Sequence, residues 1–282
     1  LQYTNDQGIS WYDITGATAL APNYNGTVPP PPGPTGDTPP NDGKGEFSWT
    51  IPNDAYTSPN GAFKAKIRII SNSDTGVTDD SDNYFAINPT VKVDFPTDAG
   101  LVVYVGDQFN VPNGIQWTAT ASISQVDIYY TTNGSTYTEI ASGVTASAGS
   151  YTSWTVPAAV STTVKIRVRS YPVATYSDES DNDFTIKAKV TNVQPSAGSA
   201  TYDTDIANAI KIRWTPAGNL GNVKIYLSAE SDYNSWPTVL SASVAGGSNG
   251  VQQTFDWNPS DNPTPNGIRN AVPGNYKVKV AL

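Results

Sequence analysis

The chain repeats itself with a period of about one small domain. Residues 165–170 read KIRVRS and residues 66–71 read KIRIIS, a spacing of 99 residues. The same spacing relates DESDNDFTI at 178–186 to DDSDNYFAI at 79–87. Two further pairs of segments lie 97 residues apart: 115–117 with 212–214, and 126–130 with 223–227. A period of this length is typical of one β-sandwich domain, so the repeat restricts the fold to successive copies of one architecture.

Alternation of apolar and polar residues favours an all-β chain. Val164, Ile166 and Val168 alternate with charged residues, as in a strand with one buried and one solvated face. Asn133-Gly134 is a strong hairpin signal, and 23 Gly and 22 Pro suit a chain with many turns. We interpret Trp117 and Trp214 as core anchors. Strands of the middle copy are predicted near 90–95, 115–117, 126–130, 137–140, 150–155, 164–169 and 183–186.

The repeat divides the 282 residues into three units: a first unit (1–88), a middle unit (89–188) and a third unit (189–282). Only the middle unit contains the whole pattern. The first unit is expected to lack its first strands and to carry a Pro-rich insertion at 23–45, and the third to lack its last strand. We expect the missing strands to come from elsewhere in a longer chain, with a neighbouring subunit as the alternative.

Composition excludes several classes of protein. The chain contains no His, Cys or Met, which rules out Ser-His-Asp and Cys-His catalysis, disulfides and the common Cys/His zinc sites. With 16 basic and 25 acidic residues the net charge is −9, a poor match for nucleic acid. No apolar run is long enough to span a membrane. These exclusions favour a protein that is not an enzyme.

Several segments of the middle unit carry a family resemblance. Residues 140–144 read IASGV, residues 150–157 read SYTSWTVP and residues 180–186 read SDNDFTI. With KIRV at 165–168, this string resembles the Kre9/Knh1-like immunoglobulin-like domain of secreted and cell-surface proteins. The resemblance implies tandem immunoglobulin-like (fibronectin III-like) β-sandwich domains outside the cell. The family is not defined by catalytic residues, so none is carried over. The third unit departs from it, with FDWNP at 255–259 in place of the Trp-Thr-Val-Pro motif.

Two acidic clusters occupy equivalent places in the first and middle units. Oxygen-rich turns of this kind suit Ca²⁺, although their spacing is not that of an EF-hand loop. The alternative is a solvated turn that keeps the surface soluble. Otherwise no cofactor is expected. The candidate calcium ligands are Asp79, Asp80, Asp82, Asp178, Asp181 and Asp183, with Glu179 in the same cluster.

Loops and aromatic side chains supply the remaining candidate sites. Asn25 and Asn133 each begin an Asn-x-Ser/Thr sequon, which would make the chain a glycoprotein, although Asn133 has a sufficient structural reason as a turn residue. Aromatic rings could stack on sugars, with sheet packing as the alternative. The candidate rings are Trp11, Tyr12, Tyr129, Tyr130, Tyr233 and Trp236.

The sequence therefore predicts a non-enzymatic structural or adhesive segment of a large extracellular surface protein, fibre or sheath. Its expected partners are copies of itself or neighbouring repeats of the same long chain. The alternative is a carbohydrate-binding or adhesin portion of a secreted multidomain enzyme, with a cell-wall or extracellular polysaccharide as ligand. Lack of Cys and Met agrees with an oxidising cell exterior.

Overall fold

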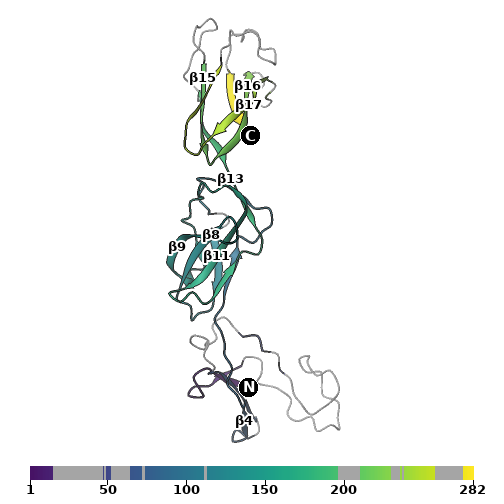
Figure 1. The fold of residues 1–282 in the computed structure, drawn as a ribbon. Helices are drawn as coiled ribbons and strands as arrows, with labels where there is room; N and C mark the ends of the chain where they lie inside the picture. The colour runs from purple at the N-terminus through teal and green to yellow at the C-terminus, as the bar shows by residue number, and fades with distance from the viewer. Residues whose placement is uncertain are drawn as a thin grey trace, which may run out of the picture.

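The computed structural model describes residues 1–14, 47, 49–51, 64–71, 74–110, 113–195, 210–229, 236, 238–257 and 276–282. The described part is almost entirely β, which confirms the predicted fold class at that level. Its one described helical element is a short 3₁₀ turn, η2 (Ala146–Ala148). Figure 1 shows the strands gathered in three units that follow one another in chain order. The Pro-rich insertion at 23–45 lies outside the described residues.

The middle unit consists of two sheets. One sheet has the order β10-β7-β5, and the other has the order β6-β13-β11-β8-β9 with β12 also paired to β11. All pairs are antiparallel except β6 with β13, which run parallel. The strands are β5 (Val91–Phe95), β6 (Val102–Tyr104), β7 (Ile115–Ala119), β8 (Gln125–Thr131), β9 (Tyr137–Thr145), β10 (Ser150–Tyr151), β11 (Ser161–Tyr171), β12 (Ser177–Glu179) and β13 (Phe184–Lys187).

The core of the middle unit lies between these sheets because each strand alternates. Val164, Ile166 and Val168 of β11 are fully buried, as the alternation predicts, while the charged residues between them face the other side. Trp117 of β7 is buried among them, and its indole N–H donates to the Ala146 carbonyl at 2.9 Å. A buried indole N–H needs such an acceptor, so this bond fixes the orientation of the ring.

The third unit repeats this arrangement. Its sheets have the orders β14-β15-β18 and β17-β16-β19. Trp214 is completely buried, and its indole N–H donates to the Gly246 carbonyl at 2.9 Å, as the indole of Trp117 does to Ala146. Both tryptophans are therefore core anchors. The strands are β14 (Lys189–Gln194), β15 (Ile210–Ala217), β16 (Leu220–Ala229), β17 (Thr238–Gly247), β18 (Gln253–Trp257) and β19 (Tyr276–Ala281).

The described part of the first unit forms one antiparallel sheet with the order β2-β1-β3-β4. Its small core contains Tyr3, Ile14, Ala65 and Ile87, with Trp49 packed against them. The strands are β1 (Gln2–Thr4), β2 (Tyr12–Asp13), β3 (Lys66–Ile70) and β4 (Thr78–Asp80).

Some predicted elements differ from the structure. The strand expected at 150–155 is limited to β10, and Thr155 makes only an isolated bridge to Gln108. Residues 178 and 179, expected in a turn, belong to the short strand β12. Strand β6 has no counterpart in the prediction. None of the described elements is a helix long and apolar enough to cross a membrane.

Candidate functional site

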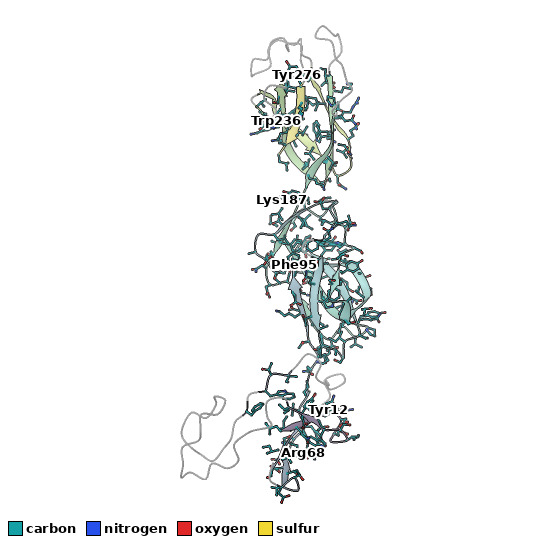
Figure 2. All side chains as sticks on the ribbon, turned by 180° about the vertical axis from the view of Figure 1, so that it is seen from behind. Tyr12, Arg68, Phe95, Lys187, Trp236 and Tyr276 are labelled. Carbon is teal, nitrogen blue, oxygen red and sulfur yellow. The ribbon has the colours of Figure 1, made fainter. Side chains whose placement is uncertain are left out.

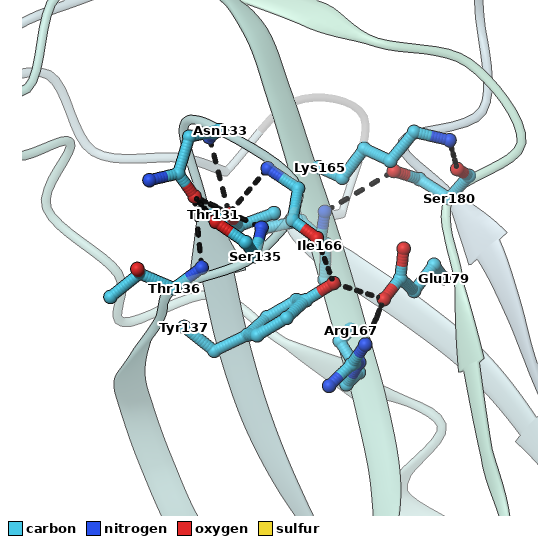
Figure 3. Close-up of polar contacts among 11 residues, drawn as sticks. Thr131, Asn133, Ser135, Thr136, Tyr137, Lys165, Ile166, Arg167, Glu179 and Ser180 are labelled. Carbon is cyan, nitrogen blue, oxygen red and sulfur yellow. Dashed lines mark hydrogen bonds and ion pairs between the residues drawn. The ribbon is translucent and has the colours of Figure 1, made fainter.

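On the larger sheet of the middle unit, an arginine, a tyrosine and a glutamate from three strands contact one another (Figure 3). Arg167 projects from β11, and the centre of its guanidinium lies 3.5 Å from the centroid of the Tyr137 ring on β9. Arg167 Nε donates to Glu179 Oε1 on β12 at 2.8 Å, and Nη2 and the Tyr137 hydroxyl donate to the same oxygen. One guanidinium thus connects side chains of three strands. We call Arg167, Tyr137 and Glu179 the middle clamp.

The first unit contains the same arrangement, with its arginine and carboxylate 99 residues earlier, and we call it the first clamp. The guanidinium of Arg68 on β3 lies 3.7 Å from the centroid of Trp11, which directly precedes β2. Its Nε and Nη2 donate to the two carboxylate oxygens of Asp80 on β4, at 2.6 and 3.0 Å. A two-bond fork of this kind is the strongest geometry for an arginine and a carboxylate.

A related pair occupies the third unit. Leu227 lies 97 residues after Tyr130 and is its counterpart. Strand pairing places Val278 opposite Leu227 and Ile166 opposite Tyr130, so the next residue, Lys279, is the equivalent of Arg167. Lys279 Nζ lies 5.5 Å from the centroid of Trp236, which precedes β17. Within the described residues, no carboxylate pairs with Lys279. The three units therefore share a cation over an aromatic ring, and the first two add a carboxylate.

The clamp carboxylates are held ionised. For Glu179, partial burial would raise the pKa, but hydrogen bonds from Tyr137 and Arg167 outweigh it and lower the pKa below its ordinary value. For Asp80, the hydrogen bonds from Arg68 lower the pKa. Burial and the Glu179 carboxylate together raise the pKa of Tyr137, so its hydroxyl remains a donor at neutral pH.

A second network lies beside the middle clamp. The Asp127 carboxylate is almost completely buried and accepts from the Ser142 hydroxyl at 2.6 Å and from the Gly143 N–H at 3.1 Å. Arg169 donates to its other oxygen at 3.2 and 3.3 Å and stacks over Tyr129. Burial would raise the pKa of Asp127, but these hydrogen bonds lower it. A buried carboxylate with this many donors is an acceptor that stabilises structure.

Protein groups engage two of the candidate calcium ligands. Asp80 is engaged by Arg68, and Asp178 accepts the Val93 N–H at 2.8 Å, which links β12 to the opposite sheet. Asp79, Asp82, Asp181 and Asp183 are exposed. Within the ranges that the structure describes, no group of three or more acidic side chains is placed to hold a metal ion.

Asn133 is exposed at the tip of the turn between β8 and β9, as the hairpin signal predicts. Its side-chain oxygen accepts the N–H groups of Ser135 and Thr136 at 3.0 and 2.8 Å, which closes the turn. Asp6 has the same role in the first unit, where it accepts from the Thr4 hydroxyl and the Ser10 N–H. Glycosylation of Asn133 stays a prediction, and Asn25 lies outside the described residues.

The candidate sugar platforms are engaged by protein groups. Trp11 lies under Arg68, and Tyr129 lies under Arg169. Tyr12 packs on Tyr3, and Tyr130 packs on Trp154 in the core. Trp236 is half-buried beside Lys279, and Tyr233 lies outside the described residues. These contacts agree with the packing alternative for the described rings.

Sequence reasoning did not find the clamps, although their signal was present. The 99-residue spacing already relates Arg68 to Arg167 and Asp80 to Glu179, and alternation places both arginines on the solvated face. The cross-strand register, which puts Glu179 opposite Arg167, was missing, and so was the pairing of each arginine with its ring, because Trp11 and Tyr137 are not 99 residues apart. A scan against models of known protein families gives no match to this chain, and a search of curated proteins gives none either.

Proposed function

We propose that this chain is a non-enzymatic structural segment of an extracellular surface protein, fibre or sheath, built from tandem immunoglobulin-like domains. In the middle unit, the order β10-β7-β5 facing β6-β13-β11-β8-β9 supports an immunoglobulin-like sandwich, with β13, β11, β8 and β9 in the places of strands G, F, C and C′. The matching Trp117 and Trp214 bonds support the same fold in the third unit.

The observation that carries the proposal is the recurrence of the clamp. An arginine and a carboxylate on neighbouring strands recur at a spacing of 99 residues, each time with an aromatic ring under the arginine, on a face that could otherwise hold a binding site. Each clamp satisfies its own charges, so it cross-links strands of one sheet and offers few free groups to a substrate. A stiff repeat whose charged groups are already paired within the unit is suited to holding a fixed distance between neighbouring domains.

The partners in this proposal are neighbouring repeats of the same long chain or further copies of it. The resemblance to Kre9/Knh1-like domains and the absence of Cys and Met support a location outside the cell. The carbohydrate-binding alternative receives no support from the described rings, which are covered by cations or packed in cores.

An antibody raised against residues 89–188 tests the location and the role together. We expect it to label intact, unpermeabilised cells of the source organism along surface filaments or the outer wall, and to detect the protein in the isolated surface fraction. Labelling that appears only after permeabilisation would overturn the proposal.

A pull-down on insoluble polysaccharide separates the two functions. We expect no retention of the chain, and none of the variant Arg68→Ala, which uncovers the Trp11 ring. Retention that rises in Arg68→Ala and is lost in Trp11→Ala would favour the carbohydrate-binding function instead.

A further inference from the structure

The turn between β15 and β16 of the third unit is buried against the middle unit. A Cβ atom placed on Gly218 would lie 2.9 Å from Ala188 Cβ, 3.0 Å from Val105 Cγ2 and 3.1 Å from Val160 Cγ2. Such distances are shorter than ordinary carbon contacts, so only a glycine allows this close approach. The backbone of one unit here lies directly against side chains of the preceding unit.

The middle unit presents an apolar surface at this place. Val105 and Ala188 are both more than nine-tenths buried, and Ala217 of the third unit packs against the core of the middle unit. An ion pair between Lys189 Nζ and Asp107 lies beside these contacts. The connection is short, because Ala188 is the only residue between β13 and β14. Lys187, labelled in Figure 2, marks this position.

The turn is also held rigidly within its own unit. The Gly218 N–H donates to the side-chain oxygen of Asn249 at 2.7 Å, and the Asn249 N–H donates to the side-chain oxygen of Asn219 at 3.0 Å. The Gly250 N–H donates to the Pro216 carbonyl at 2.8 Å. These bonds fix the shape of the turn, so it meets the middle unit as a preformed surface.

The equivalent turn of the middle unit behaves differently. Ala121 lies 97 residues before Gly218 and is exposed, as is Ser122 beside it. Gly218, in contrast, is buried. Burial of this turn is therefore a property of the contact between the middle and third units, and does not follow from the fold of a unit alone.

We propose that the middle and third units form a fixed joint, in which Val105, Val160 and Ala188 are the docking surface for the turn at Ala217-Gly218-Asn219. The joint holds the two units in one relative orientation. Apolar contact at Gly218 carries it, with the Lys189–Asp107 ion pair at its rim. The inference goes beyond the proposed function and does not depend on it.

Distances between spin labels on the full chain test the joint. The chain has no Cys, so introduced cysteines are its only thiols. We place one label at exposed Thr138→Cys in the middle unit and the other at exposed Ala242→Cys in the third. A pair within the middle unit, Thr138→Cys with Lys92→Cys, gives the reference width. We expect a single cross-joint distribution about as narrow as the reference, also in 1 M NaCl, because apolar contact is not screened by salt.

Two variants break the joint from opposite sides. Gly218→Ala introduces the clashing Cβ, and Val160→Asp places a charge on the docking surface; each is expected to broaden the cross-joint distribution at least twofold. The matched control is Gly100→Ala in the middle unit, where the backbone has a similar positive φ and no atom lies within 4 Å of the new Cβ. It is expected to leave the width unchanged. A broad cross-joint distribution in the parent chain, or an unchanged width in both joint variants, would overturn the proposal.

Discussion

The first and middle clamps reach the same arrangement with different residues. In the first clamp Asp80 uses both oxygens, one for each arginine nitrogen of Arg68, and the ring is a tryptophan. In the middle clamp one oxygen of Glu179 receives Arg167 and also the hydroxyl of Tyr137. The choice of ring therefore changes which groups donate to the carboxylate, while the arginine and the carboxylate stay opposite each other on neighbouring strands.

This difference indicates what the repeat preserves. Trp can be exchanged for Tyr and Asp for Glu, provided that a cation on the central strand contacts a ring on one side and a carboxylate on the other. A binding surface would be expected to fix the chemistry of its exposed groups, whereas a brace needs only the cross-strand contact. Four predictions test this comparison, from the largest expected effect to the smallest.

The first prediction compares the buried faces of the two central strands. Ile166 is fully buried and Ile67 is half-buried. We expect Ile166→Ala to lower the free energy of unfolding by about 2–5 kcal/mol, because it leaves a cavity in a packed core. Ile67→Ala should lower the free energy of unfolding by less, because the Ile67 side chain is already partly exposed to solvent. Hydrogen exchange of residues 161–171 and 64–71 measures both; equal losses of protection would contradict the comparison.

The second prediction concerns the middle clamp. Arg167→Ala removes the stack on Tyr137 and leaves Glu179, about one-third exposed, without its cation. Because solvent screens such a pair, we expect a loss of only about 1 kcal/mol. Hydrogen exchange of the backbone amides should become faster in both β12 and β11. Lys92→Ala, which removes an exposed lysine paired only loosely with Asp94, is the control and should change neither.

The third prediction addresses the hydroxyl that distinguishes the two clamps. Tyr137→Phe deletes the hydroxyl bond to Glu179 but keeps the ring under Arg167, at a cost of about 0.5–1.5 kcal/mol. The pKa of Glu179 should rise, since one of the groups that lower it is lost. Carboxyl titration by NMR measures this. Trp11→Phe in the first clamp should leave the pKa of Asp80 nearly unchanged; a rise there equal to that of Glu179 would show that the clamps do not differ in this way.

The fourth prediction is a loss of stability in acid. The pKa values of Asp80, Glu179 and Asp127 are lowered, and hydrogen bonds from Thr4 and Ser10 lower the pKa of Asp6 to about 2. A carboxylate with a lowered folded-state pKa contributes stability that is present above its unfolded pKa of about 4, and that is lost as the pH falls through the folded value. The midpoint of thermal unfolding should therefore fall between about pH 4 and pH 2.

Controls sharpen the acid prediction. Asp6→Asn should remove a part of the pH dependence in the first unit only, because Asp6 has no contact with the middle clamp among its hydrogen bonds. A midpoint that is flat between pH 5 and pH 2 would show that these ion pairs contribute nothing to folding.

Much of the fold follows from local pattern. Alternation places Val164, Ile166 and Val168 in the core, and the Trp117 and Trp214 positions are visible in the repeat. The 99-residue spacing also contains the clamp arginines and carboxylates. These features depend on periodicity, which a single sequence displays directly.

The remaining features depend on long-range register. Strand β6 has only three residues, Val102–Tyr104, and exists because β13 lies beside it, more than 80 positions later. The predicted alignment of the third unit with the middle unit was also shifted in register, because it placed FDWNP at 255–259 at the position of the Trp-Thr-Val-Pro motif. Strand pairing instead places Phe255 opposite Ile212, as Tyr151 lies opposite Ile115. Local composition cannot distinguish these registers.

The parallel pairing of β6 with β13 has a mechanical consequence. These two short strands connect an early segment of the middle unit to its last strand, and they run in the same direction. When tension is applied to the two ends of such a unit, neighbouring parallel strands are pulled past one another. Their hydrogen bonds then share the force and must break together in shear, whereas a hairpin opens one bond at a time.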